Sequence, residues 1–241
     1  MVRTAINLYS VRELDRPMDE ILDRVAAAGY DGVQFSGDYG DLSPGETADA
    51  LAERDLDPVP AHVDIDLMES DPEGVVDDQT RIGTHGAVVP WLGPDHFETR
   101  EAAEATAERV EELRETLAAE DFDVHYHNHA HEFVEVDGGV AFEVFADASS
   151  VFIEPDVGWI RTGGADPTAL IRRYGDRIDL VHMKDMTADG EFCEIGDGVT
   201  DMQACADAAR EVDASWLIYE HDEPDDPVAS IDRGAEFLAG L

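Results

Sequence analysis

The chain has 241 residues, of which 16 are basic and 57 are acidic, so its formal net charge is −41. Apolar residues still make up 43% of it, which excludes a disordered acidic tail and indicates a folded protein. Nucleic acids and anionic membranes are disfavoured as partners, since proteins bind both through Lys and Arg. We interpret the charge as halophilic adaptation to a salt-rich cytoplasm, because molar salt shortens electrostatic screening to about 3 Å.

The remaining composition indicates a cytoplasmic protein. Two cysteines are too few for a disulfide framework, which suits a reducing compartment. The N-terminus shows no signal segment, and no apolar run approaches the roughly 18 residues that span a bilayer. We therefore expect a small molecule as the partner, and the sequence allows a homo-oligomer.

Short apolar or β-branched blocks alternate with helical segments along the chain. The blocks begin near Val2, Gly32, Leu56, Ala87, Phe122, Val151, Ile178 and Ser215. Helices are predicted between these blocks and after the last one. The signals are proline at the start, apolar residues at helical spacing, and in the first helix a glycine at the end. These helices span about 17–29, from 44 onwards, 72–82, 98–120, 140–148, 166–174, 201–212 and 228–238.

This alternation predicts an α/β fold with parallel strands, because crossover helices join parallel neighbours. Eight such units in about 250 residues suit a (β/α)8 TIM barrel with a closed eight-stranded sheet. A doubly wound open sheet is the alternative, but it would usually carry a Gly-rich loop after the first strand. The stretch from Leu8 to Arg12 contains no glycine. We expect one domain over residues 1–241.

Residues 124–133 contain four of the nine histidines. Alternate residues of a strand share a face, so His125, His127 and His129 would point the same way as long as the strand lasts. Imidazole serves as metal ligand, general base or hydrogen-bond donor near neutral pH. The alternative is a solvated loop that happens to be rich in histidine.

Polar residues also follow the other predicted strands, where a barrel carries its catalytic groups. Lys184 is the most informative, because it is the only lysine in the chain and lies two residues after His182. A compact ammonium suits a carbonyl or enolate oxygen, and arginine does not replace it geometrically. The alternative is a simple ion pair with Asp185.

Four of these residues have the chemistry of a site for one divalent metal ion. Glu132, Asp156, His182 and Glu220 would supply three carboxylates and one imidazole from the fifth to eighth predicted strands. That set suits Mn²⁺, Mg²⁺, Co²⁺ or Zn²⁺. The alternative is a group of ordinary solvated carboxylates with a core histidine.

The chain resembles the sugar phosphate isomerase/epimerase family of xylose isomerase-like TIM barrels. Five motifs carry the resemblance in order: Tyr126–Phe133, Glu154–Trp159 with Gly163–Pro167, His182–Asp185, Gly196–Gly198 followed by Asp201, and Tyr219–Asp222. The resemblance implies a metal-dependent barrel acting on sugars or polyols. It also assigns the metal to Glu132, Asp156, His182 and Glu220, with His127 or His129 as alternatives to Glu132.

Two features bear on the substrate. Trp159 stands where some relatives have a histidine, which suggests an aromatic wall for the face of a sugar. Only Lys184 and Arg161 are cationic near the proposed site, and no Gly-rich anion cradle is visible there. We therefore favour an unphosphorylated sugar, keto-sugar or inositol-like polyol.

The chemistry implied is isomerisation or epimerisation through an enediolate. Glu132 and Glu220 would move the proton, while Lys184 and a histidine among His62, His127 and His129 hold oxygens. Dehydration or β-elimination of a keto-sugar or inosose could use the same site. Two further alternatives are a non-catalytic sugar-binding barrel and a DNA-repair nuclease, the latter disfavoured by the charge of −41.

Overall fold

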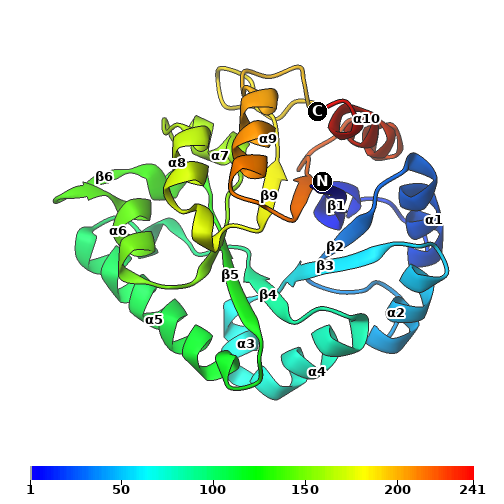
Figure 1. Cartoon of the computed structure of the whole chain (residues 1–241), viewed down its shortest axis with the longest axis horizontal. Helices are drawn as coiled ribbons and strands as arrows, with labels where there is room; N and C mark the ends of the chain where they lie inside the picture. Colours follow the sequence, from blue (N-terminus) through cyan, green and yellow to red (C-terminus); the bar gives the residue numbers. More distant parts are fainter. Residues whose placement is uncertain (1) are drawn as a thin grey trace.

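The computed structural model describes residues 2–241, and eight parallel strands form its central sheet (Figure 1). The order across the sheet is β8-β5-β4-β3-β2-β1-β10-β9, and a bridge between Asp156 and His182 links its two ends into a TIM barrel. The strands are β1 Arg3–Asn7, β2 Gly32–Ser36, β3 Asp57–His62, β4 Gly86–Val89, β5 Asp123–His127, β8 Phe152–Glu154, β9 Leu180–Met183 and β10 Trp216–Tyr219. The predicted fold class is confirmed.

The helices form a ring outside the strands (Figure 1). Several begin with proline directly after a capping Ser or Asp, whose side chain accepts a hydrogen bond from a free backbone N–H. The longer helices are α1 Met18–Ala28, α2 Pro44–Ala52, α4 Pro72–Ile82, α5 Arg100–Ala118, α6 Ala141–Ala148, α8 Pro167–Arg173, α9 Met202–Glu211 and α10 Pro227–Ala239. All eight predicted helices are confirmed.

The sequence analysis missed several short elements. They are too short to show a helical or strand period, and some of them follow directly on a barrel strand. They are α3 Ile65–Ser70, α7 Val157–Thr162, the 3-10 turns η1 Leu8–Val11, η2 Pro94–His96, η3 Ala130–Phe133 and η4 Gly175–Arg177, and the hairpin of β6 Glu135–Val136 and β7 Gly139–Val140.

The inside of the barrel changes from apolar to polar along its axis. Toward the N-terminal ends of the strands the interior holds a small apolar cluster, which consists of Ala5, Val59, Val88, Leu180, Trp216 and Ile218. Successive residues of a strand alternate between the inner and outer faces, so the next inward positions lie nearer the C-terminal ends. These are occupied by buried polar side chains, among them Asn7, Gln34, His127, Glu154 and His182. The barrel therefore presents polar groups at the end where such folds bind substrates.

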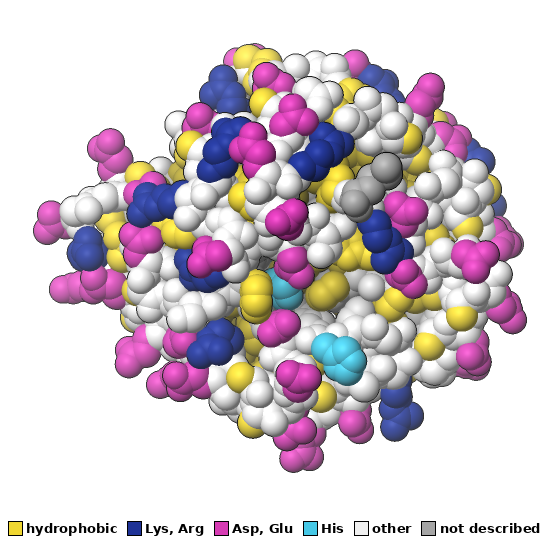
Figure 2. Space-filling model, viewed as in Figure 1, with side chains coloured by type: hydrophobic (Ala, Val, Ile, Leu, Met, Phe, Trp, Pro, Cys, Tyr) yellow, Lys and Arg dark blue, Asp and Glu magenta, His cyan; other side chains and the backbone are white. Residues whose placement is uncertain are grey.

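Acidic side chains are spread over the face shown in Figure 2, with basic ones between them. Ion pairs use many of the arginines; for example, Arg109 contacts Asp66 at 2.6 Å and Glu69 at 2.7 Å. No helix within residues 2–241 has both the length and the apolar character needed to cross a membrane.

Candidate metal and substrate site

Four buried side chains from the late strands meet at the C-terminal end of the barrel. His127 ends β5, Asp156 follows β8, His182 belongs to β9 and Glu220 follows β10. One ligand atom of each lies within 4.8 Å of the others. His182 Nδ1 is 3.1 Å from Glu220 Oε2, and His127 Nε2 is 3.5 Å from Asp156 Oδ2. The barrel therefore brings three of the four predicted ligands together and adds His127.

This group has the properties of a metal site. Both ring nitrogens of His127 and Oδ2 of Asp156 are buried without a hydrogen-bond partner in the described chain. Buried polar atoms normally have one, so these atoms are available to a ligand. Burial lowers the pKa of His127, which keeps its imidazole in the neutral form that binds metals. Two imidazoles and two carboxylates fit a divalent ion such as Mn²⁺, Co²⁺ or Zn²⁺.

The structure places Glu132 outside this group. The η3 turn starts three residues after β5, and side chains beyond that point no longer alternate between the inside and the outside of the barrel. Glu132 therefore lies on the outer side of β5, with Tyr126. There its Oε1 accepts a hydrogen bond of 2.8 Å from the hydroxyl of Tyr126, which packs against Phe145. Burial raises the pKa of Glu132 well above its usual range. The geometry favours His127 as the fourth ligand, and the metal role of Glu132 stays a prediction.

A buried hydrogen-bond network holds His182 from the other side. Its Nε2 lies 2.7 Å from Gln34 Oε1 and 3.3 Å from Glu154 Oε2. Gln34 Oε1 also accepts from Asn7 Nδ2, and Gln34 Nε2 donates to Glu154 Oε1 at 2.6 Å. Nε2 therefore donates into the network, and Nδ1 faces the site. Burial lowers the pKa of His182, but Glu154 and Glu220 outweigh it and raise the pKa to about 10, so a divalent ion bound at Nδ1 would displace the proton there.

His62 belongs to the same network. Its Nε2 is 2.7 Å from Glu154 Oε2, and its Nδ1 is 3.4 Å from Asn7 Nδ2. An amide nitrogen can only donate, so Nδ1 accepts and Nε2 carries the proton. His62, Glu154 and His182 also meet closely enough for a second metal set, but their atoms are engaged in these hydrogen bonds. We interpret them as support for His182.

Lys184 contacts three carboxylates. Its Nζ lies 3.3 Å from Asp156 Oδ2, 2.8 Å from Glu220 Oε2 and 2.6 Å from Asp222 Oδ1. Burial alone would lower the pKa of Lys184, but these carboxylates raise it, so the side chain stays charged. Burial raises the pKa of Asp222 to about 6 even beside this ammonium. The indole of Trp159 lies 5.0 Å from Nζ and closes the other side.

A cavity of about 370 Å³ opens above this group, and we call it the central cavity. Three aromatic side chains border it, and the Trp91 side chain is half exposed with its ring 4.5 Å from that of His129. Burial lowers the pKa of His129, which keeps this ring neutral. The cavity is lined by Tyr9, Ser36, His62, Pro90, Trp91, His127, His129, Trp159, Lys184, Glu220 and Asp222. The predicted residues His62, His127, His129 and Trp159 therefore share one cavity.

The loop after β9 is organised by Asp185, which the sequence analysis considered as a partner of Lys184 and as part of the motif His182–Asp185. Its two oxygens accept four backbone hydrogen bonds of 2.9–3.2 Å, from Met186, Gly196, Gly198 and Thr200. A Cβ on Gly198 would lie 2.1 Å from Asp185 Oδ1, so only glycine fits there. A Cβ on Gly158 would similarly lie 2.6 Å from the carbonyl oxygen of Lys184. The motifs around these glycines therefore fix the position of Lys184.

Comparisons with known proteins agree with this architecture. The family described as xylose isomerase-like TIM barrel matches residues 22–241. The rhizopine catabolism protein MocC of Rhizobium meliloti is 25% identical over 94% of this chain and 82% of its own length. Inosose dehydratase of Geobacillus kaustophilus is 30% identical over 41% of this chain and 38% of its own.

Solved structures show the same fold. A sugar phosphate isomerase/epimerase from Parabacteroides distasonis has a TM-score of 0.84 and 22% identity, over 99% of this chain and 94% of that one. D-allulose 3-epimerase from Methylomonas sp. has a TM-score of 0.68 and 14% identity, over 99% and 97% of the two chains.

Proposed function

Because the chain belongs to the family of xylose isomerase-like TIM barrels, we propose that it is a metal-dependent isomerase or epimerase of a sugar, keto-sugar or related polyol. The observation that carries this proposal is the convergence of His127, Asp156, His182 and Glu220 next to Lys184, where buried atoms of His127 and Asp156 lack a hydrogen-bond partner in the described chain. A non-catalytic sugar-binding barrel does not require such a group, because hydrogen bonds and aromatic contacts suffice to hold a sugar.

Asp156, His182 and Glu220, with His127 as the fourth candidate, would hold the divalent ion. When bound, the ion supplies positive charge that stabilises the developing enediolate of the substrate. Lys184 would hold a substrate oxygen in the same cavity, because it lines that cavity and stays positively charged. The aromatic ring of Trp159 would pack against the C–H face of the substrate.

The proton would be moved by carboxylates at the cavity. Burial opposes ionisation of Glu220, but Lys184 and His182 outweigh it and hold its pKa well below the usual range, so the side chain is in the ionised form that a proton acceptor needs. Glu132 is the second candidate from the sequence, although it does not line the central cavity. Asp222 does line it and is the candidate that the geometry adds.

The lining of the cavity supports an unphosphorylated substrate. Lys184 is the one Lys or Arg among the described residues that line it, and three carboxylates already surround its ammonium. A phosphate group would meet these carboxylates without a free cation to bind it. A neutral polyol can instead donate hydroxyl hydrogen bonds to them.

The test is proton exchange in heavy water at high salt. Metal-loaded protein is incubated with ketoses, aldoses and inosose-type ketones, and deuterium at the carbon next to the carbonyl is measured by NMR. We expect exchange with at least one compound and none with the Asp156→Ala variant. Exchange accompanied by loss of water would favour a dehydratase or β-eliminating lyase, the alternative suggested by the inosose dehydratase relative. Binding without exchange would support the non-catalytic barrel.

A further inference from the structure

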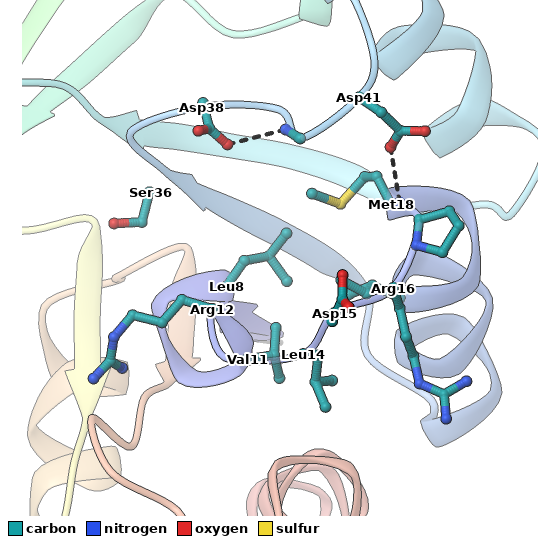
Figure 3. A pocket seen from close by; sticks show the side chains of 13 residues that line it. Leu8, Val11, Arg12, Leu14, Asp15, Arg16, Met18, Ser36, Asp38 and Asp41 are labelled. Atoms are coloured by element: carbon teal, nitrogen blue, oxygen red, sulfur yellow. Dashed lines mark hydrogen bonds between the residues drawn. The ribbon is translucent and has the colours of Figure 1, made fainter.

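A second cavity of about 560 Å³ adjoins the central cavity, and we call it the lateral cavity (Figure 3). Ser36, at the end of β2, lines both cavities. Arg12 lines the lateral cavity, and its guanidinium donates to the carbonyl oxygens of Tyr9 and Asp222, two residues that border the central cavity. The two cavities therefore share a wall.

The floor of the lateral cavity is apolar. Leu8 and Val11 come from the η1 turn, whereas Met18 and Ile21 come from the start of α1, and all four are buried. Leu8 lies in the middle of the view in Figure 3, between Ser36 and Met18. Such a floor provides contact for an apolar surface of a ligand, such as the C–H face of a ring.

Charged residues of both signs form the rim. Asp38 Oδ1 accepts a hydrogen bond of 3.0 Å from Gly40 N, and Asp41 Oδ1 accepts one of 3.1 Å from Met18 N, as Figure 3 shows. These bonds fix both carboxylates at the edge of the cavity before any ligand arrives, which lowers the entropic cost of binding. The other charged residues on the rim are Arg12, Asp15 and Arg16.

This mixture gives no strong preference for a ligand of either sign. Three carboxylates and two guanidinium groups share one rim, so no field of a single sign develops there. A neutral hydroxylated ring satisfies both parts of the lining, since its C–H face can pack on the floor while its hydroxyl groups bond to the carboxylates and guanidinium groups.

We propose that the lateral cavity binds a second sugar ring, which is linked through the glycosidic oxygen to the keto-sugar ring that reacts in the central cavity. The substrate class is then a glycoside of a keto-sugar, with the linkage passing Ser36 and Arg12. This inference rests on the proposed function, which places the reacting ring in the central cavity. The preference for a second ring comes from the lateral cavity alone.

A substitution at Asp15 tests this proposal. Asp15 is exposed and forms no hydrogen bond or ion pair with any residue in 2–241, so Asp15→Trp should fill the cavity without removing a contact. Asp49→Trp is the matched control, because Asp49 is exposed on α2 and lines neither cavity. The probes are 3-oxo-glucose and 3-oxo-cellobiose, the latter oxidised in its non-reducing ring so that the glycosidic oxygen is β to the carbonyl.

Calorimetry and deuterium exchange are measured with both probes. We expect the unmodified protein and Asp49→Trp to bind the disaccharide about tenfold more tightly, and Asp15→Trp to lose this preference while still binding 3-oxo-glucose. Equal binding of the two probes, or a preference that survives in Asp15→Trp, would overturn the proposal, as would binding of neither. A preference without exchange would reject the proposed reaction alone, whereas exchange without a preference would reject the lateral site alone.

Discussion

Acidic residues occupy two contrasting environments in this molecule. On the surface, carboxylates such as Asp66 and Glu69 face solvent and share an arginine, and water screens their charge. At the C-terminal end of the barrel, Glu154, Asp156 and Glu220 are buried, and each has named partners within hydrogen-bonding or ion-pairing distance. The same residue type is therefore solvated in one place and buried among specific partners in the other, and burial with its partners distinguishes the two.

The buried region also lacks electrical balance without a ligand. Asp156, Glu220 and Asp222 place three carboxyl groups around one permanent cation, Lys184, and a fourth carboxyl group, that of Glu154, lies against His182. Burying like charges is unfavourable unless cations compensate them. A divalent ion would provide that compensation, and the following predictions test how far this region depends on it.

The largest effect is expected from Asp156. Asp156→Ala and Asp156→Asn should both lose the molar equivalent of metal and lower the exchange rate about a thousandfold, because several kcal/mol of charge stabilisation disappear. Asparagine can still accept the hydrogen bond of 2.8 Å from Trp159 N that begins α7, so Asp156→Asn should keep the fold. Elemental analysis and circular dichroism provide the measurements. Full metal content in Asp156→Asn would contradict the assignment.

Lys184 should affect turnover without affecting metal binding. Lys184→Met removes the ammonium that holds a substrate oxygen, and we expect a loss of about a hundredfold in kcat. The metal content should remain, since no proposed ligand is removed. Lys184→Arg should not restore activity, because a guanidinium does not fit the enclosed space beside Trp159. Recovery of activity in Lys184→Arg would show that only the charge matters.

Sequence patterns predicted the fold and most of the candidate ligands at the ends of the last four strands, for simple physical reasons. Apolar blocks such as Val124 on β5 and Leu180 on β9 mark strands because buried parallel strands are apolar. Asp156, His182 and Glu220 each lie at or just after such a strand, so the barrel topology alone brings them together. The unique lysine stood out because the rest of the chain uses arginine.

The missed details depend on local turns and on uncharged residues. The η3 turn diverts Glu132 to Tyr126, and no sequence period reports where a turn of four residues ends a strand. Gln34 was missed because an amide within an apolar strand carries no charge signal, although it bonds to His182 and Glu154. These side chains are identifiable only from their partners in space.

Glu154 should tune the metal site through His182. Glu154→Gln keeps the shape but replaces one acceptor oxygen with an amide donor that faces the donors of Gln34 or His62. Residues that orient a ligand histidine contribute about 10- to 100-fold to metal affinity, and we expect a loss of that size. Metal titration of this variant against Glu104→Gln, an exposed substitution on α5, is the measurement. Unchanged affinity would assign Glu154 a purely structural role.

Asp185 should affect stability more than metal affinity. Asp185→Asn places an amide donor against backbone N–H groups that now donate to carboxylate oxygens, and we expect a loss of about 3 kcal/mol in the free energy of unfolding. Asp201→Asn is the control, because asparagine caps a helix as well as aspartate does. Denaturant titration compares the two variants, and equal stability would show that the loop is held by other contacts.

The surface carboxylates should show the smallest effect per residue, and salt should abolish it. With a net charge of −41, removal of one exposed negative charge relieves repulsion, so Asp49→Asn should stabilise the protein by about 0.3 kcal/mol in dilute buffer. In molar KCl, charges are screened over about 3 Å, so the gain from Asp49→Asn should disappear. The same screening should raise the melting temperature of the unmodified chain. Asp156→Ala should still lack its metal in the same salt, because the buried group is shielded from solvent ions. Equal melting temperatures in dilute buffer and molar KCl would contradict halophilic adaptation, since surface repulsion would then contribute nothing to stability.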